Sequence, residues 1–433
     1  MRRDKSEGNS SYQKSQIETT LSKIKIIDGS IDKEQIKKQI IDYYETKNKT
    51  FLVNEYKCDF IDLFCGAGGL SVGLEHEGFK PILALDKDEF SLQTYRFNRP
   101  WMSEDMIIQG DIRLLVENSI FPHVPLIVGG PPCQGFSVAN KHKKENDERN
   151  ELYKFYVHAV EQSKPDFFLM ENVEGILKVF DAIRDDFRRI GYYACDPLIL
   201  TPKDFGFPQS RRRVFILGIS NKHKAQRDEL YQIFKENIEE KRVGIIYTLR
   251  DAIMDLPALK AKSLKNATYS ECKDWGYTIA GFQNNKSKYV SLINDGLGKS
   301  IPLLNHKSKY NNDRDILIFQ TLKPGEKSDA ESIQEINPYK SRGHIFKDKF
   351  DKLVLDEPCK AITAHMYYDC NMYIHPTQAR GLTPREAARV QGFPDDYLFL
   401  GSPNEWYRQV GNAVSPLMAR VIGNALMKLI QRV

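Results

Sequence analysis

One cysteine stands where a reactive thiol could act. Cys133 lies in GGPPCQGFS (129–137), directly after an apolar run at 125–130 that predicts a buried strand. In open α/β sheets ligands bind at the carboxyl ends of the strands, and a thiolate is a strong nucleophile. A lone cysteine is often just a small buried side chain, but these glycines and prolines favour an exposed turn. Because a free thiol is only a few per cent ionised near neutral pH, Cys133 needs activating neighbours.

Charged side chains beside two other strands could share this site. Glu171 ends the apolar run 165–172, where a carboxyl group could hydrogen-bond or protonate a ring nitrogen. A helix cap or a structural acid is the alternative for Glu171. Arg211 and Arg213 alternate along a segment that leads into another apolar run, so they share one face if it is extended. Such arginines could hold a carboxylate or a carbonyl, or could simply charge a strand edge against aggregation.

A glycine-rich turn predicts a nucleotide-like ligand at the same sheet edge. DLFCGAGG (62–69) follows the first predicted strand and opens a helix, whose N-terminal N–H groups can meet a ligand. Asp86 ends the second strand and could accept hydrogen bonds from ribose hydroxyls, while 110–112 could border an adenine. Position 71 is Ser rather than the third glycine of a dinucleotide site, which favours a smaller adenosine-type ligand. A purely structural turn or a dehydrogenase site remains open on this pattern alone.

The elements that position these residues alternate between strands and helices. This alternation predicts an α/β fold with a doubly wound, Rossmann-like parallel sheet. Helices are predicted at 69–77, 89–98, 152–162, 179–190 and 416–429, with an accessory helix at 30–44. Strands are predicted at 58–64, 80–86, 105–109, 125–130, 165–172 and 212–219. After about residue 245 the alternation stops, which indicates a second, smaller, loop-rich domain.

Composition narrows the class of protein. The 433 residues are 41% hydrophobic and 28% charged, typical of a globular protein of two or three domains. No apolar run is long enough for a membrane span, and the N-terminus lacks the apolar segment of a secretory signal. Seven scattered cysteines argue against a disulfide framework and for a reducing, cytoplasmic compartment. No CxxC or HExxH spacing occurs, so no metal site is expected.

The charge is unevenly distributed. Residues 201–350 hold 27 Lys and Arg against 18 Asp and Glu, although the whole chain has a net charge of only +5. This basic region suggests an anionic partner, and a merely solvated basic surface fits the composition equally well.

The motifs together resemble those of the 5-methylcytosine DNA methyltransferase family. They occur in the family's order and cover residues 58–430 with one long gap. The matching stretches are DLFCGAGG (62–69), DKD (86–88), GDI (110–112), GGPPCQGFS (129–137), ENV (171–173), QSRRRVF (209–215), LTPREAARVQGFPDDY (382–397) and QVGNAVSP (409–416).

The resemblance implies S-adenosylmethionine as cofactor and assigns residues to it and to the base. The cofactor residues would be Phe64, Gly66, Gly68, Gly69, Leu70, Asp86, Asp111, Ile112, Pro131, Asn412 and Ala413. Asp86 departs from the pattern, because the family more often has Glu at the ribose-binding position. The base pocket would hold Pro131, Cys133, Glu171, Arg211 and Arg213.

The implied chemistry is covalent. Cys133 would add to C6 of a cytosine flipped out of double-stranded DNA, so that C5 becomes nucleophilic. Glu171 would bond N3 and the exocyclic amine, Arg213 would steady the O2 side, and Arg211 would brace Glu171. The polar stretch 137–150 would close over the DNA.

The resemblance also implies contacts with the duplex. Groove contacts are expected from 306–310, 338–349 and 363–368, whereas Arg389 is expected to be structural. The individual DNA contacts would be Ser137, Arg149, Gln209, His306 and Lys307.

The resemblance further implies a division of the chain and its partners. An N-terminal extension (1–56) would precede a catalytic and cofactor domain (57–245) and a target-recognition domain (246–375). A hinge (376–408) would lead to a C-terminal segment (409–433) that returns to the catalytic domain. Double-stranded DNA would be the partner of a monomer in the prokaryotic cytoplasm, at the nucleoid, and a separate restriction endonuclease could accompany it.

Two other functions remain open from the sequence. A tRNA cytosine-C5 methyltransferase would share the fold, but the long variable region argues against it. A catalytically inactive DNA-binding regulator is disfavoured by the intact Cys133, Glu171 and Arg213.

Overall fold

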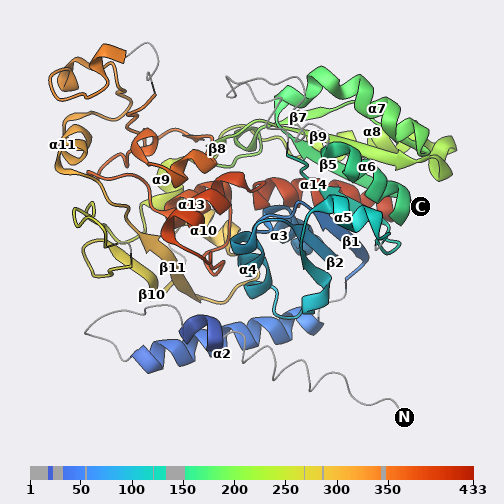
Figure 1. Ribbon diagram of the computed structural model, residues 1–433, viewed down its shortest axis with the longest axis horizontal. Helices are drawn as coiled ribbons and strands as arrows, with labels where there is room; N and C mark the ends of the chain where they lie inside the picture. Colours follow the sequence, from blue (N-terminus) through green and yellow to red (C-terminus); the bar gives the residue numbers. More distant parts are fainter. Residues whose placement is uncertain are drawn as a thin grey trace.

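The computed structural model describes most of the chain (Figure 1). The described residues are 18–22, 33–53, 56–119, 121–132, 152–267, 269–284, 287–342 and 348–433. Cys133, Ser137 and Arg149 therefore lie outside the described residues, as does the stretch 137–150.

An eight-stranded mixed sheet forms the centre of the molecule. Five neighbouring strands, in the order β3-β2-β1-β4-β5, run parallel, whereas β9 runs antiparallel to β5 and pairs in turn with β6 and β7. The strands are β1 (Cys58–Leu63), β2 (Phe79–Asp86), β3 (Ile107–Gln109), β4 (Leu126–Gly129), β5 (Phe167–Asn172), β6 (Tyr192–Ala194), β7 (Leu198–Leu200) and β9 (Arg213–Ser220). The predicted α/β class is confirmed. The predicted parallel arrangement holds for β1 to β5 but is wrong at β9, which follows β7 and returns antiparallel between β5 and β6.

Helices cover both faces of this sheet, as a doubly wound fold requires (Figure 1). One face packs on α3 (Gly69–His76), α8 (Arg227–Glu239) and α14 (Pro416–Ile430). The other packs on α5 (Ile112–Glu117), α6 (Leu152–Ser163) and α7 (Phe180–Arg189). Strand residues alternate between the two cores: Phe60 faces the first and Ile61 the second, each without solvent exposure. Each such side chain contributes about 1.5–3 kcal/mol by burial.

The second part of the chain has fewer regular elements. Its elements are α9 (Leu249–Ile253), β10 (Gly276–Asn284), α10 (Lys288–Ile293), β11 (Ser300–Lys307) and α11 (Asp313–Thr321). A separate small core gathers around Phe319 and Phe350. The short strand β12 (Cys359–Lys360) pairs with β8 (Gln209–Ser210), which ties this part to the chain just ahead of Arg211.

Three helices connect the sheet-forming part of the chain to the second part. Helices α12 (Pro384–Gln391) and α13 (Pro403–Asn412) share a core with α9 and α10. At the other end, α2 (Lys33–Val53) packs across β10 and β11 and also contacts Phe97 of α4 (Glu89–Phe97). The accessory helix predicted at 30–44 is therefore present, but it runs to Val53.

The last helix, α14, packs on one face of the sheet, and its close contact with α3 requires a glycine at position 73. Ser415 caps α14, and α14 crosses α3 so closely that a Cβ on Gly73 would lie 2.3 Å from the Pro416 carbonyl oxygen and 2.4 Å from the Ala419 Cβ. The stretch Pro403–Ile430 is long and apolar enough for a membrane span by composition, yet 67% of its most apolar window is buried inside the protein, as in a core helix.

We expect Gly73→Ala to lower the free energy of unfolding by about 1–3 kcal/mol, because α3 and α14 must separate to admit the methyl group. Chemical denaturation measures this. The matched control is Gly298→Ala, where no atom lies within 4 Å of the added Cβ. Equal stability of the two variants would contradict the close crossing.

Candidate active site

A cleft of about 520 Å³ opens at the carboxyl ends of β1, β2, β4 and β5, and it gathers most of the predicted site residues. Of the residues predicted for the cofactor and base, those that line it are Phe64, Gly66, Gly69, Leu70, Asp86, Asp111, Ile112, Pro131, Glu171, Arg211, Arg213, Asn412 and Ala413. Segments more than 340 residues apart in the sequence thus meet in one cavity.

The loop between β1 and α3 takes a backbone shape that requires glycine. Phe64, Gly66 and Gly68 all have positive φ angles, of 59°, 53° and 85°. Gly68 does not line the cleft but caps α3, and a Cβ there would lie 2.7 Å from both Tyr95 and Arg99. Gly68 therefore shapes the loop rather than touching a ligand. The first residues of α3, Gly69 and Leu70, line the cleft, and the N-terminus of a helix suits an anionic group.

Asp86 is both a loop anchor and a cleft residue. Its Oδ2 accepts a hydrogen bond from the Gly66 N–H at 2.7 Å and its Oδ1 accepts one from the Asp88 N–H at 2.8 Å. Burial raises the pKa of Asp86, although these two N–H groups act in the opposite direction. A carboxylate has about four acceptor positions, and because the Lys87 N–H also bonds Asp86, about one remains for a ligand hydroxyl.

Asp111 is held differently. It caps α5 and accepts hydrogen bonds from the Arg113 side chain, which lowers the pKa of Asp111.

The C-terminal segment completes the cleft. Gln391 donates hydrogen bonds to the Val410 and Ala413 carbonyl oxygens, which fixes the turn between α13 and α14. A Cβ on Gly411 would lie 2.2 Å from the Ala364 N, so Gly411 is what allows segment 363–364 to reach the cleft. Asn412 and Ala413, which were predicted to return to the cofactor, line this cleft.

An acid and an arginine face each other at the other end of the cleft. In the antiparallel β5–β9 pair, Glu171 lies opposite Phe215, and the Arg213 Nε lies 3.0 Å from the Glu171 Oε1. Burial raises the pKa of Glu171, and the Arg213 and Arg211 charges moderate the rise. Glu171 is therefore a carboxyl group that can hold a proton at higher pH than a solvated one.

Arg211 is less exposed than Arg213, and it contacts the second half of the chain. It donates a hydrogen bond to the Ile362 carbonyl oxygen, and its side chain is buried. Burial, and then the neighbouring Arg213 charge, lower the pKa of Arg211 to about 9. Arg211 acts on Glu171 through its charge, whereas Arg213 also contacts Glu171 directly.

Asn172 is a functional residue that the sequence reasoning passed over. Its Nδ2 donates to the Pro131 carbonyl oxygen at 2.9 Å, and its Oδ1 accepts from the Val173 N–H at 2.8 Å. Asn172 therefore holds the turn that leads from β4 toward Cys133. The signal was present in the ENV stretch, where only the glutamate was given a role.

Three residues predicted to contact DNA are buried. His306 bonds the Pro257 carbonyl and the Thr383 hydroxyl, and burial lowers its pKa to about 4. Lys307 forms an ion pair with Glu271 at 3.3 Å, and the Gln209 side chain has no exposed surface. The prediction for His306 and Lys307 is therefore wrong, because these polar groups stabilise the interior beneath β10 and β11. Gln209 also makes no surface available to DNA in this structure.

Two of the segments that were predicted to contact DNA grooves, 306–310 and 363–368, lie together. The Lys309 Nζ joins them by donating to the carbonyl oxygens of Met366, Tyr367 and Tyr368. Tyr368 is 72% exposed there. Arg389 is structural as predicted, because it is buried and paired with Asp395 and Asp255.

The described cysteines do not offer a competing nucleophile in the cleft. Burial raises the pKa of Cys58, Cys65, Cys195, Cys359 and Cys370, so each is a neutral thiol at neutral pH. Among them Cys65 alone lines the cleft, and its thiol is almost completely buried. Within the described residues no group of three or more His, Cys, Asp and Glu could hold a metal ion.

Comparison with known proteins decides the family. The model of the C-5 cytosine-specific DNA methylase family matches residues 58–428. The chain belongs to this family. The predicted resemblance is thus confirmed, and with it the activity of a DNA cytosine-5 methyltransferase.

Relatives agree with this assignment. The methylase is 34% identical to the type II methyltransferase M.DdeI of Desulfomicrobium norvegicum, over 85% of this chain and 88% of that protein. It is 30% identical to M.AgeI of Thalassovita gelatinovora, over 84% and 98%. A crystal structure of a prophage-encoded E. coli protein, described as a DNA modification methyltransferase, is 25% identical with a TM-score of 0.64, covering 87% of this chain and 100% of that one.

A buried acid, Asp62, lies near the end of β1, before the loop that leads into α3 of the methylase. Asp62 is 1% exposed and accepts a hydrogen bond from the Ser71 hydroxyl at 2.6 Å, and Ser71 also contacts the Tyr95 hydroxyl. Burial raises the pKa of Asp62 to about 7, against the opposing effects of Ser71 and Arg99.

This raised pKa gives a prediction for stability. The pKa of Asp62 is higher in the folded protein than in the unfolded chain. The part of the free energy of unfolding that depends on Asp62 is therefore largest below about pH 4 and falls as the pH rises through 7. Relative to wild type, Asp62→Asn, which has no titrating group at 62, should therefore gain up to about 4 kcal/mol in unfolding free energy between pH 4 and pH 8. Denaturation curves at several pH values measure the difference. A difference independent of pH would show that Asp62 titrates normally.

Proposed function

We propose that the cleft binds S-adenosylmethionine and a cytosine swung out of double-stranded DNA, and that C5 is methylated there through a covalent bond between Cys133 and C6. The observation that carries this proposal is the single cavity, which joins the loop at Gly66 and Asp86 to the Glu171–Arg213 pair. Its volume of about 520 Å³ lies in the range of small-ligand sites.

The residues present fit the cofactor. The N–H groups at the start of α3 suit its carboxylate, the remaining acceptor position of Asp86 suits a ribose hydroxyl, and Asp111 and Ile112 border the adenine end. Asn412 and Ala413 close the methionine end from the C-terminal segment. When bound, the cofactor supplies a sulfonium methyl group, the electrophile that C5 requires.

The protein's own groups make C5 reactive. Cytosine C5 is a poor nucleophile because the ring is electron-poor. The Cys133 thiolate adds to C6, and the electrons displaced from the C5–C6 bond make C5 enamine-like. Glu171, whose pKa is raised by burial, holds a proton at N3 and so offsets the charge pushed into the ring, while Arg213 faces the O2 side. After methylation, loss of the C5 proton and expulsion of the thiolate restore the aromatic ring.

The substrate geometry demands base flipping. A stacked cytosine cannot present C5 and C6 to a thiol and a methyl donor at once, so it must leave the duplex at a cost of a few kcal/mol. We assign target recognition to 246–375, with 57–245 as the catalytic and cofactor domain. We also propose that the protein acts as a monomer in the prokaryotic cytoplasm, with a separate restriction endonuclease as its companion. The names of its relatives, type II methyltransferases, support the restriction-modification setting.

Transfer of a tritiated methyl group from S-adenosylmethionine to mixed-sequence duplex DNA tests the proposal. We expect incorporation by the wild type, and a loss of at least about a thousandfold with Cys133→Ala, because only the thiolate activates C5. DNA affinity should persist in that variant.

The matched control for this loss is Cys272→Ala, which removes a partly exposed thiol outside the cleft and should keep full activity. Turnover by Cys133→Ala close to that of the wild type would refute the covalent route, and label transfer to tRNA but not to DNA would refute the substrate.

DNA binding should weaken steeply with salt, because the basic stretch 201–350 meets phosphates. Each phosphate contact contributes about −0.9 to the slope of log affinity against log salt concentration. Fluorescence anisotropy between 50 and 300 mM NaCl measures the slope, and a flat response would contradict the assignment of the basic region to DNA.

A further inference from the structure

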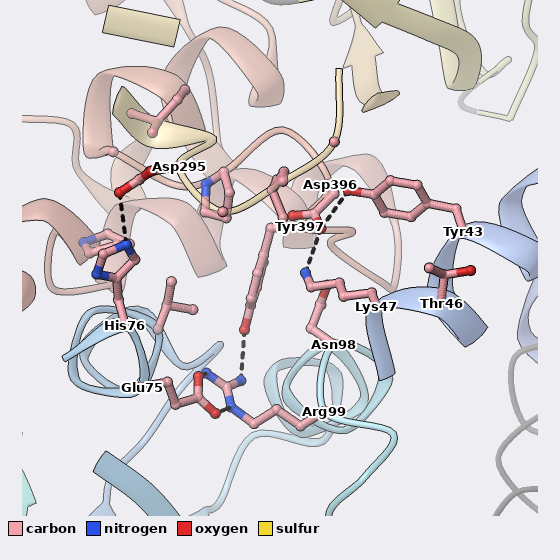
Figure 2. Close-up of a pocket in the computed structure, with 18 of the residues that line it drawn as sticks. Tyr43, Thr46, Lys47, Glu75, His76, Asn98, Arg99, Asp295, Asp396 and Tyr397 are labelled. Atoms are coloured by element: carbon pink, nitrogen blue, oxygen red, sulfur yellow. Dashed lines mark hydrogen bonds and ion pairs between the residues drawn. The ribbon is translucent and has the colours of Figure 1, made fainter. Parts of the chain in front are cut away.

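A second cavity, of about 900 Å³, lies beside the segment after α12 (Figure 2). Its walls come from α2, from the end of α3, from the loop before β11 and from the segment after α12. Two of the side chains that line it, Arg99 and Tyr397, also contact the proposed cofactor loop between β1 and α3. The walls of this cavity are therefore connected to a loop that borders the cleft.

Two side chains in this cavity bond the loop directly. The Tyr397 hydroxyl donates to the Ala67 carbonyl oxygen, and the Arg99 Nη2 donates to the Gly68 carbonyl oxygen at 3.3 Å. Arg99 also donates to the Tyr397 hydroxyl at 3.0 Å, so the two side chains fix one another. Glu75 holds the guanidinium with two hydrogen bonds of 2.8 Å each (Figure 2).

Helix α2 reaches this pair through the neighbouring residue. The Asp396 side chain is buried, and its Oδ2 accepts from the Lys47 Nζ at 2.5 Å and from the Tyr43 hydroxyl at 3.2 Å (Figure 2). The Tyr44 hydroxyl donates to the Asp396 carbonyl oxygen, which belongs to the peptide bond that leads into Tyr397. Three side chains of α2 therefore bond Asp396, two through its carboxylate and one through its backbone, immediately before Tyr397.

We propose that Tyr397 and Arg99 are positioning residues for the cofactor loop, and that α2 sets them through Asp396. This inference rests on the proposed binding of S-adenosylmethionine in the cleft. It assigns a role in cofactor affinity to the N-terminal extension, which lies outside the family match at 58–428.

The physical reason is preorganisation. The loop contains three residues with positive φ, a shape that a loosened chain would leave for more common conformations. A loop that already has the binding conformation loses little conformational entropy when a ligand binds. A loosened loop loses more, and its affinity for the ligand is lower. Loss of the supports should therefore weaken cofactor binding more than it weakens folding or DNA binding.

The first experiment compares two buried tyrosines. Tyr397→Phe removes the hydroxyl that bonds Ala67, and Tyr289→Phe removes an equally buried hydroxyl that bonds the Arg389 carbonyl, away from the loop. We expect Tyr397→Phe to weaken the binding of S-adenosylhomocysteine, measured by calorimetry, about fivefold to twentyfold. Tyr289→Phe should leave that affinity within twofold of wild type, and both variants should bind DNA normally.

The KM for S-adenosylmethionine should rise in Tyr397→Phe with kcat nearly unchanged, because the reacting groups are untouched. Equal cofactor affinity in the two variants, or equal losses in both, would overturn the positioning role, since a merely structural hydroxyl would act alike at either place.

The second experiment tests α2 in the full-length chain. Lys47→Met removes the cation bonded to Asp396, and Lys38→Met removes an exposed lysine of the same helix. We expect Lys47→Met to weaken cofactor binding about threefold to tenfold, Lys47→Arg to restore most of it, and Lys38→Met to change nothing. Identical affinities for Lys47→Met and Lys38→Met would show that α2 does not act through Asp396.

Failure of this inference is distinguishable from failure of the proposed function. If the wild type binds no S-adenosylhomocysteine, the assignment of the cleft is wrong. If the wild type binds it and the variants bind it equally well, only the positioning role is wrong.

Discussion

The proposed chemistry depends on a carboxyl group that lies beside an arginine in a low-dielectric cleft. Glu171 ends β5, and the antiparallel neighbour β9 brings Arg213 within 3.0 Å of it. Burial makes the charged form of the acid costly, and the guanidinium offsets part of that cost. The result is a group able to hold or release a proton at a ring nitrogen. Because β9 runs antiparallel to β5, the start of β9 lies beside the end of β5, and this places the arginine next to the acid.

Convergence of distant segments supplies the rest of the site. Glycines allow this at three close approaches: Gly69 meets the Val414 carbonyl, Gly411 meets segment 363–364, and Gly73 admits α14 against α3. The contacts of Gly69 and Gly73 join the helix that follows β1 to the C-terminal segment, whereas Gly411 joins that segment to residues 363–364. The cleft is therefore complete only when the C-terminal segment has packed against the sheet. Substitutions in that segment can alter the cofactor loop without contacting the ligand. Helix α2 is likewise connected to this loop, because Lys47 bonds Asp396 and the next residue, Tyr397, bonds Ala67.

Local pattern predicted the catalytic half well and the remainder poorly. Apolar runs gave β1, β2, β4 and β5, because strands buried on both faces have little freedom of composition. The direction of β9 was not predictable from its residues, since a buried strand reads alike in either direction. His306 and Lys307 failed because polar residues in a basic, loop-rich stretch look the same whether they meet DNA or satisfy one another inside. The Lys47–Asp396 contact spans 349 residues, and no local signal carries it.

The most direct test is to trap the bond itself. Incubation of the wild type with S-adenosylmethionine and duplex DNA that contains 5-fluorocytosine blocks the final loss of the C5 substituent, so the protein should stay attached to the DNA. Protease digestion and mass spectrometry then locate the attachment. The account predicts one nucleotide-bearing peptide, modified at Cys133, and none in Glu171→Gln within the time of a wild-type turnover. Attachment at any other cysteine, or methylated DNA released with no adduct, would contradict it.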